Sequence, residues 1–125
     1  MPELAVDPAL FAPEFVGAPE DPAGPLIPVV VSLTTPGMNQ LSYDLTREFT
    51  LTAFEAVRAA GGRPRLVDSA AAQLVSSAEV YSSADAVLFL GGGDVDGSCY
   101  GYEGPPPANE YGVDLRADRY CIDLL

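Results

Sequence analysis

The segment AVLFLGGGDVDGSCYG, residues 86–101, joins a short apolar run to three consecutive glycines, and two aspartates follow directly. The apolar run is typical of a strand, and glycine lets the backbone after it adopt a positive φ or approach a ligand closely. In open α/β sheets, binding sites form beyond the carboxyl ends of the strands. The segment therefore predicts a strand of a parallel sheet with a candidate site at its end.

Upstream, the sequence predicts two strands with a helix between them. The β-branched run at residues 27–35 indicates a strand buried on both faces, and residues 63–68 indicate a second, shorter strand. Residues 41–62 between them predict a helix with Ser42 as its N-cap and the glycine pair 61–62 as its end. Spacings of three and four predict that one stripe of this helix is buried: Leu45, Phe49, Ala53, Ala56, Val57 and Ala60.

The remaining segments complete an alternation of strands and helices. A weakly helical segment covers residues 69–84, and the third strand is expected at residues 85–90. An irregular loop is expected at residues 91–112, and a helix is expected to start within residues 113–125. This order is typical of an α/β fold with a parallel sheet. Because three parallel strands make a thin sheet with open edges, we expect further strands after Leu125.

Residues 1–26 differ from the rest of the chain. They are rich in proline, acidic and without a basic residue, which predicts a largely disordered lead-in. Residues 27–125 are expected to form the folded domain.

Charge and composition exclude several function classes. The formal net charge is −12, and all six basic residues are arginine, so neither nucleic acid nor an anionic membrane is an expected partner. The chain has no histidine, which excludes a Cys–His or Ser–His pair built from this chain alone and removes the commonest metal ligand. We expect no metal and no cofactor.

The expected location is the cytoplasm. Two cysteines do not form a disulfide framework, and the N-terminus shows no secretory signal. No stretch approaches the roughly 20 apolar residues that span a bilayer.

Four interpretations of the glycine run were compared. A phosphate loop would need the Walker lysine or the dinucleotide spacing, and Asp94 would repel an anion. A calcium loop starting at Asp94 has its glycine too early and Pro105 where the bidentate glutamate belongs. Two interpretations stay open: a tight turn after a strand, and an oxyanion hole whose backbone N–H groups stabilise a negative oxygen.

Taken together, four segments resemble one enzyme family. They are IPVVVSLTT, FTLTAFEAVRAAGGRPRLVD, ADAVLFLGGGDVDGSCYG and VDLRADRYCIDLL. In this order they resemble the amino-terminal half of the peptidase C26 family, the γ-glutamyl-γ-aminobutyrate hydrolase-like members of the class I glutamine amidotransferase superfamily. The resemblance covers residues 27–125.

The resemblance implies a flavodoxin-like parallel sheet with flanking helices, incomplete in this chain. It implies hydrolysis of a γ-glutamyl amide through a cysteine acyl-enzyme, with a histidine as base and a glutamate that orients it. The family's glycine loop donates a backbone N–H to the oxyanion, a role that falls here on Gly92 or its neighbours Gly91 and Gly93.

The sequence also departs from the family pattern. The cysteine elbow, the catalytic histidine and the glutamate have no counterpart in these residues, so this chain alone is expected to be inactive. Leu90 and Gly97 replace prolines, Ala117 stands where an arginine is usual, and Cys121 stands where a glutamate is common.

Five further residues are candidates at the loop and the last helix. Asp94 and Asp96 either orient the loop or line the substrate pocket, where a carboxylate could hold the α-ammonium of a γ-glutamyl group. Tyr100 is either loop packing or pocket wall. Cys99 lies near two aspartates and has no histidine as a base, and Cys121 is expected to be packed, so neither is expected to be the nucleophile.

These observations support hypotheses of three classes. The first is the amino-terminal portion of a γ-glutamyl amide hydrolase, completed by other residues or by a second chain. The second is an inactive half-domain that serves as a binding or scaffold subunit and covers its open sheet edge by pairing with a partner or with itself. The third, a flavodoxin-like small-ligand module, has no motif of its own.

Overall fold

The computed structural model describes residues 20–125, so most of the predicted lead-in lies outside the described residues. The elements in chain order are β1 (Leu26–Val31), α1 (Gln40–Ala59), β2 (Arg63–Asp68), α2 (Ser77–Tyr81), β3 (Leu88–Gly91), the 3-10 turn η2 (Gly97–Tyr100) and α3 (Leu115–Leu124). The structure thus has the predicted alternation of strands and helices. β1 begins one residue before the predicted domain boundary, and β3 includes the first glycine of the run.

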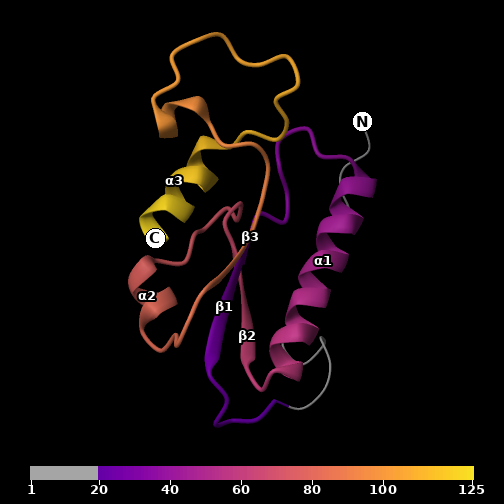
Figure 1. The fold of residues 1–125 in the computed structure, drawn as a ribbon, viewed down its shortest axis with the longest axis vertical. Coiled ribbons are helices and arrows are strands. Elements are labelled where there is room, and N and C mark those ends of the chain that lie inside the picture. Colours follow the sequence, from indigo (N-terminus) through magenta and orange to yellow (C-terminus); the bar gives the residue numbers. More distant parts are fainter. Residues whose placement is uncertain (1–19) are drawn as a thin grey trace.

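The three strands form one parallel sheet in the order β2-β1-β3. Val29 in β1 pairs with Leu66 on one side and with Leu88 on the other. The register of β3 shifts between Val30 and Val31, where Gly91 becomes the partner of Val31. Helix α1 covers one face of the sheet, and α2 and α3 lie on the other (Figure 1). The parallel α/β fold class is therefore confirmed.

The central strand β1 is buried on both faces, as its β-branched run predicts. Val29 and Val30, whose side chains point to opposite faces, are 0% and 1% exposed. On the side of α2 and α3, one core cluster consists of Val30, Val67, Val80 and Leu124. On the other side Val31 packs with Leu33 and Leu66.

The predicted buried stripe of α1 is wrong. Leu45 and Phe49 are 43% and 67% exposed, whereas the buried residues of the helix are Tyr43, Thr50 and Phe54. Thr50 can be buried because its hydroxyl donates to the carbonyl of Thr46 at 2.8 Å, which leaves no unpaired donor. Apolar spacing alone therefore selects a stripe that is offset from the most buried face of the helix.

The predicted N-cap is also wrong by one turn. Asn39 caps α1, and its side-chain oxygen accepts a hydrogen bond from the N–H of Ser42 at 2.9 Å. Ser42 lies inside the first turn, with its side chain at the edge of a cavity described below.

Glu20 anchors the chain that leads into β1. Its carboxylate pairs with Arg58 of α1 and Arg65 of β2, each at 2.9 Å. Burial raises the pKa of this carboxyl, but the hydrogen bonds from Arg65 and Arg58 outweigh it and hold the pKa below its usual value. Glu20 therefore connects the helix to the edge strand.

Two phenylalanines of α1 provide a matched test of the observed helix face. Phe54 is fully buried, so Phe54→Ala should lower the free energy of unfolding by about 3–5 kcal/mol. Phe49→Ala removes the same ring from an exposed position and should cost less than about 1 kcal/mol. Urea unfolding followed by circular dichroism measures both. Equal losses, or a larger loss at Phe49, would contradict the observed helix orientation.

Candidate functional site

Three residues that directly follow the three strands meet at the carboxyl edge of the sheet. Ser32 follows β1, Ser69 follows β2 and Gly92 follows β3. The N–H of Ser32 donates to the carbonyl of Gly91, and the N–H of Ser69 donates to that of Val31, both at 3.0 Å. The Ser32 and Ser69 hydroxyls are buried and hydrogen-bonded to each other at 2.6 Å. A rigid polar floor thus lies beneath the glycine loop.

Each glycine of the run has a steric reason to be glycine. Gly91 has a φ of 95°, a left-handed conformation that disfavours side chains. A Cβ on Gly92 would lie 2.8 Å from the Oγ of Ser32, and a Cβ on Gly93 would collide with the backbone of Gly112. The glycines therefore form a tight, closely packed turn.

This packing leaves two backbone donors open. The N–H groups of Gly92 and Gly93 form no hydrogen bond with another residue in the range 20–125. The next N–H, that of Asp94, is already used, because it donates to the carbonyl of Tyr111 at 2.7 Å. Two backbone donors without an acceptor among the described residues therefore follow β3, in the run for which the sequence left a tight turn and an oxyanion hole open.

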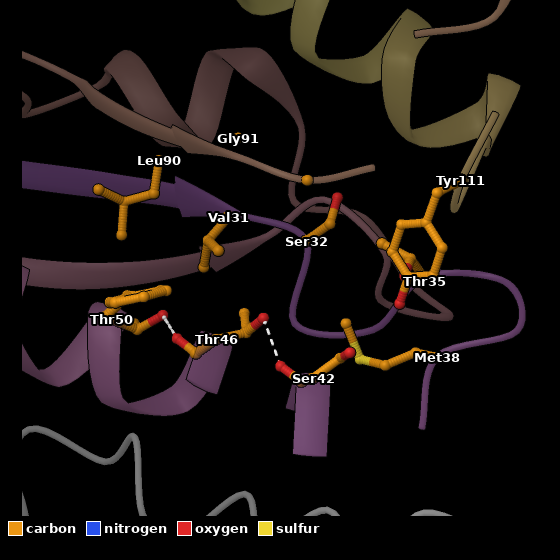
Figure 2. A pocket seen from close by; sticks show the side chains of 12 residues that line it. Val31, Ser32, Thr35, Met38, Ser42, Thr46, Thr50, Leu90, Gly91 and Tyr111 are labelled. Carbon is orange, nitrogen blue, oxygen red and sulfur yellow. Dashed lines mark hydrogen bonds between the residues drawn. The ribbon is translucent and has the colours of Figure 1, made fainter. Parts of the chain in front are cut away.

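A cavity of about 260 Å³ lies between the glycine turn and α1, and we call it the α1-side cavity. Figure 2 shows its wall, with Leu90 and Gly91 of β3 opposite Thr46 and Thr50 of α1. The full lining is Val31, Ser32, Thr35, Met38, Ser42, Thr46, Phe49, Thr50, Leu90, Gly91, Gly92 and Tyr111. None of these residues carries a carboxylate or guanidinium group.

Hydroxyl groups form much of the polar surface of the α1-side cavity. Thr46 donates to the carbonyl of Ser42 at 2.9 Å, and Thr50 donates in the same way to Thr46, as the dashed lines in Figure 2 show. The Oγ1 of Thr35 is buried and has no hydrogen-bond partner among the described residues. The cavity therefore offers acceptors, one hydroxyl without a partner and the nearby glycine turn.

A second cavity, of about 180 Å³, lies between the glycine turn and α3, and we call it the α3-side cavity. Gly92 lines both cavities. Unlike the first, the α3-side cavity contains two carboxylates: Asp114, which caps α3, and Asp118, whose Oδ2 accepts the N–H of Asp96 at 2.8 Å. The glycine turn thus separates an uncharged cavity from an acidic one.

Cys121 also lines the α3-side cavity, but its environment disfavours the thiolate. Burial raises the pKa of the thiol; a hydrogen bond with Ser69 lowers it in part, and the charge of Asp118 raises it further. A nucleophilic cysteine needs the opposite environment.

The predicted loop residues have separate places. Asp94 is reciprocally bonded to Tyr111: each N–H donates to the other residue, at 2.7 Å in both cases. Asp96 caps η2, and two hydrogen bonds from Ser98 hold the pKa of its carboxyl below the usual value. Tyr100 is 64% exposed and lies beside Asp94 in a shallow depression, outside both cavities. Of the predicted residues, only Gly91 and Gly92 line both cavities, and Gly93 lines the α3-side cavity alone.

Sequence analysis missed the residues that form the floor and wall of the site. Ser32 and Ser69 are each the first residue after a strand, so the rule that sites form beyond strand ends could have selected them. Thr46 and Thr50 gave no such signal, because they are polar and lie outside the apolar stripe predicted for the helix.

Within residues 20–125 no group of three or more histidine, cysteine, aspartate or glutamate side chains is placed to hold a metal ion. In the same range, no helix combines the length and apolar character needed to cross a bilayer. Comparisons with protein-family models, curated proteins and solved structures give no match. The glycine turn and its two cavities are therefore the features of residues 20–125 that bear on function.

The environment of Cys121 predicts low thiol reactivity in the folded protein. In a Cys99→Ser variant, the remaining Cys121 thiol should react with a disulfide reagent at pH 8 about tenfold more slowly in the folded state than in urea. Raising the pH should increase the folded-state rate beyond the point where an ordinary thiol levels off, because the raised pKa delays thiolate formation. Absorbance of the released thiol measures the rate. Equal rates in buffer and urea would show that Cys121 is not buried as described.

The contact between Gly92 and Ser32 predicts coupled substitutions. Gly92→Ala should lower the free energy of unfolding by about 1–3 kcal/mol, because the new methyl group would overlap the Ser32 side chain. Ser32→Gly removes that side chain, so the double variant should lose less stability than the sum of the two single variants, by about 1 kcal/mol. Urea titrations of the four proteins measure this coupling. Simple additivity would contradict the close approach.

Proposed function

We propose that this protein is part of a γ-glutamyl amide hydrolase similar to the peptidase C26 family, in which it supplies the oxyanion-binding loop. The observation that carries the proposal is the Gly92 N–H, which lies beyond the end of β3, next to both cavities and without an acceptor in residues 20–125. The strand order β2-β1-β3 is the order with which a flavodoxin-like sheet begins, and it supports a class I glutamine amidotransferase-like fold.

The chemistry assigns one task to this loop. When a cysteine thiolate attacks the amide carbon, the carbonyl oxygen takes up negative charge, and a preorganised N–H stabilises it by about 3–4 kcal/mol. The amine then leaves with a proton from the base, and water hydrolyses the thioester. Because the chain contains no histidine, the base must come from residues outside this sequence. The environment of Cys121 disfavours its thiolate, which supports a nucleophile that also comes from outside this sequence.

The acidic cavity suits one end of such a substrate. A γ-glutamyl group carries an α-ammonium, and Asp114 and Asp118 line the α3-side cavity directly beside the glycine turn. We assign the ammonium to this cavity. Asp94 and Asp96, which the sequence suggested for this role, do not line the α3-side cavity. Their carboxylates accept backbone N–H groups of the loop, and the proposal gives them a positioning role.

A second function is favoured by the exposed edge of β3. Within the described residues β3 pairs only with β1, and Phe89 and Leu90 are 36% and 38% exposed. Open edges of this kind pair readily with another strand. In this alternative, the protein is a binding or scaffold subunit that pairs with a partner chain or a second copy and performs no hydrolysis.

The decisive experiment uses native protein isolated with the polypeptides that co-purify with it. We expect it to hydrolyse γ-glutamyl-p-nitroanilide and to be inactivated by a γ-glutamyl chloromethyl ketone, which alkylates a cysteine nucleophile. Peptide mass spectrometry should find the label on a cysteine other than Cys99 and Cys121. The isolated 125-residue chain should show neither turnover nor labelling.

Two results would contradict the proposal. Turnover by the isolated chain with the label on Cys99 or Cys121 would place the nucleophile in this sequence. Native protein without turnover or labelling would exclude the hydrolase and favour the subunit that pairs through β3.

A further inference from the structure

We propose that the α1-side cavity binds the uncharged, alkyl-bearing side of an amide ligand. If the ligand is the substrate of the proposed hydrolase, the cavity receives its leaving amine and selects amines without a charged substituent. Only this naming of the ligand rests on the proposed function. Three properties of the cavity itself point to this ligand: its lack of charge, its hydrogen-bonding groups and its apolar wall.

The lining of the α1-side cavity carries no charge. Aspartate, glutamate and arginine make up 19% of the chain, yet none of the twelve lining residues belongs to these types. A carboxylate or ammonium group placed there would lose hydration without gaining a partner of opposite charge. The α3-side cavity, with Asp114 and Asp118, shows that the protein does place charge on the other side of the same glycine turn.

The polar groups of the cavity are complementary to an amide. Thr46 has already donated its hydroxyl proton to a helix carbonyl, so its partly exposed oxygen can only accept. Gly92 has an N–H without an acceptor, and the buried Oγ1 of Thr35 has no partner among the described residues. An amide supplies a carbonyl oxygen for the donor and an N–H for the acceptors, which an amine cation or a carboxylate alone does not.

The apolar part of the lining includes two large apolar side chains that are unusually exposed to solvent. Phe49 and Leu90 are 67% and 38% exposed although both are large and apolar, and they line the cavity together with Val31 and Met38. An alkyl chain in the cavity would cover this surface and gain the hydrophobic contribution of its methylenes, about 0.8 kcal/mol for each one buried. The cavity therefore suits an amide whose nitrogen carries an alkyl group.

Three small probes of matched shape test this inference without the glutamyl group. They are N-butylacetamide, which is uncharged, N-acetyl-4-aminobutyrate, which ends in a carboxylate, and N-acetylputrescine, which ends in an ammonium. Titration of the ¹⁵N-labelled chain should shift the amide resonances of Gly91, Gly92 and Thr46 with N-butylacetamide. The two charged probes should bind at least about tenfold more weakly.

Substitutions on α1 supply matched controls. Thr46→Val keeps the side-chain shape but removes the acceptor, and it should weaken N-butylacetamide about fivefold. Phe49→Ala removes the apolar wall and should weaken it about tenfold. Thr52→Val makes the same change as Thr46→Val, and Leu45→Ala likewise truncates a large apolar side chain; both positions are exposed and outside the cavity lining, so both variants should leave binding unchanged.

The inference is overturned if N-butylacetamide shifts no resonance of the lining, if a charged probe binds as well, or if the control substitutions weaken binding equally. Because the probes contain no γ-glutamyl group, binding can persist where native protein hydrolyses nothing. Probe binding together with an absence of hydrolysis would support the proposed ligand of the cavity and contradict the proposed hydrolase. Turnover by native protein of amides with charged amines, at rates equal to those with alkylamines, would instead reject the assignment of the cavity to the leaving amine.

Discussion

Parallel hydrogen bonding on both sides of β1 is the constraint on which the candidate site in residues 20–125 depends. Because β2 and β3 both pair with β1 in the same direction, the residues that follow the three strands emerge at one edge. Ser32, Ser69 and Gly92 meet there as a direct result. A shift of β3 by one residue would exchange the faces of its side chains and move Gly92 away from Ser32.

The same close approach has two effects. It requires glycine at position 92, because a side chain would overlap Ser32. It also leaves the Gly92 N–H available beside two cavities, one uncharged and one acidic. The two interpretations of the glycine run that the sequence left open, a tight turn and an oxyanion hole, are therefore compatible. The tight turn is what allows a backbone N–H, that of Gly92, to stay free for a ligand.

The sequence predicted the parts of the fold that local patterns determine. The β-branched run identified β1, and the apolar run before the glycines identified β3 and the edge at which the site lies. The orientation of α1 was wrong, because Thr50 satisfies its hydroxyl within the helix and is buried like an apolar residue. Local spacing cannot reveal such a contact.

The same limitation applies to the site. The hydrogen bond between Ser32 and Ser69 joins residues 37 positions apart. Thr46 lines a cavity with Gly91 and Gly92 because α1 packs on that face of the sheet. These pairings are properties of the packed tertiary structure. The pattern of the sequence determines which backbone forms the edge, and packing determines which side chains surround it.

The reciprocal bonds between Asp94 and Tyr111 close the long loop at its base. The geometry of the glycine turn is thereby separated from the proline-rich stretch at the tip of the loop, whose residues are mostly exposed. In evolutionary terms, this tip can change in length and sequence at little cost to the structure, because insertions in exposed loops add only slowly to closure entropy. Relatives of this protein would then differ in what surrounds the site while keeping the same backbone within it.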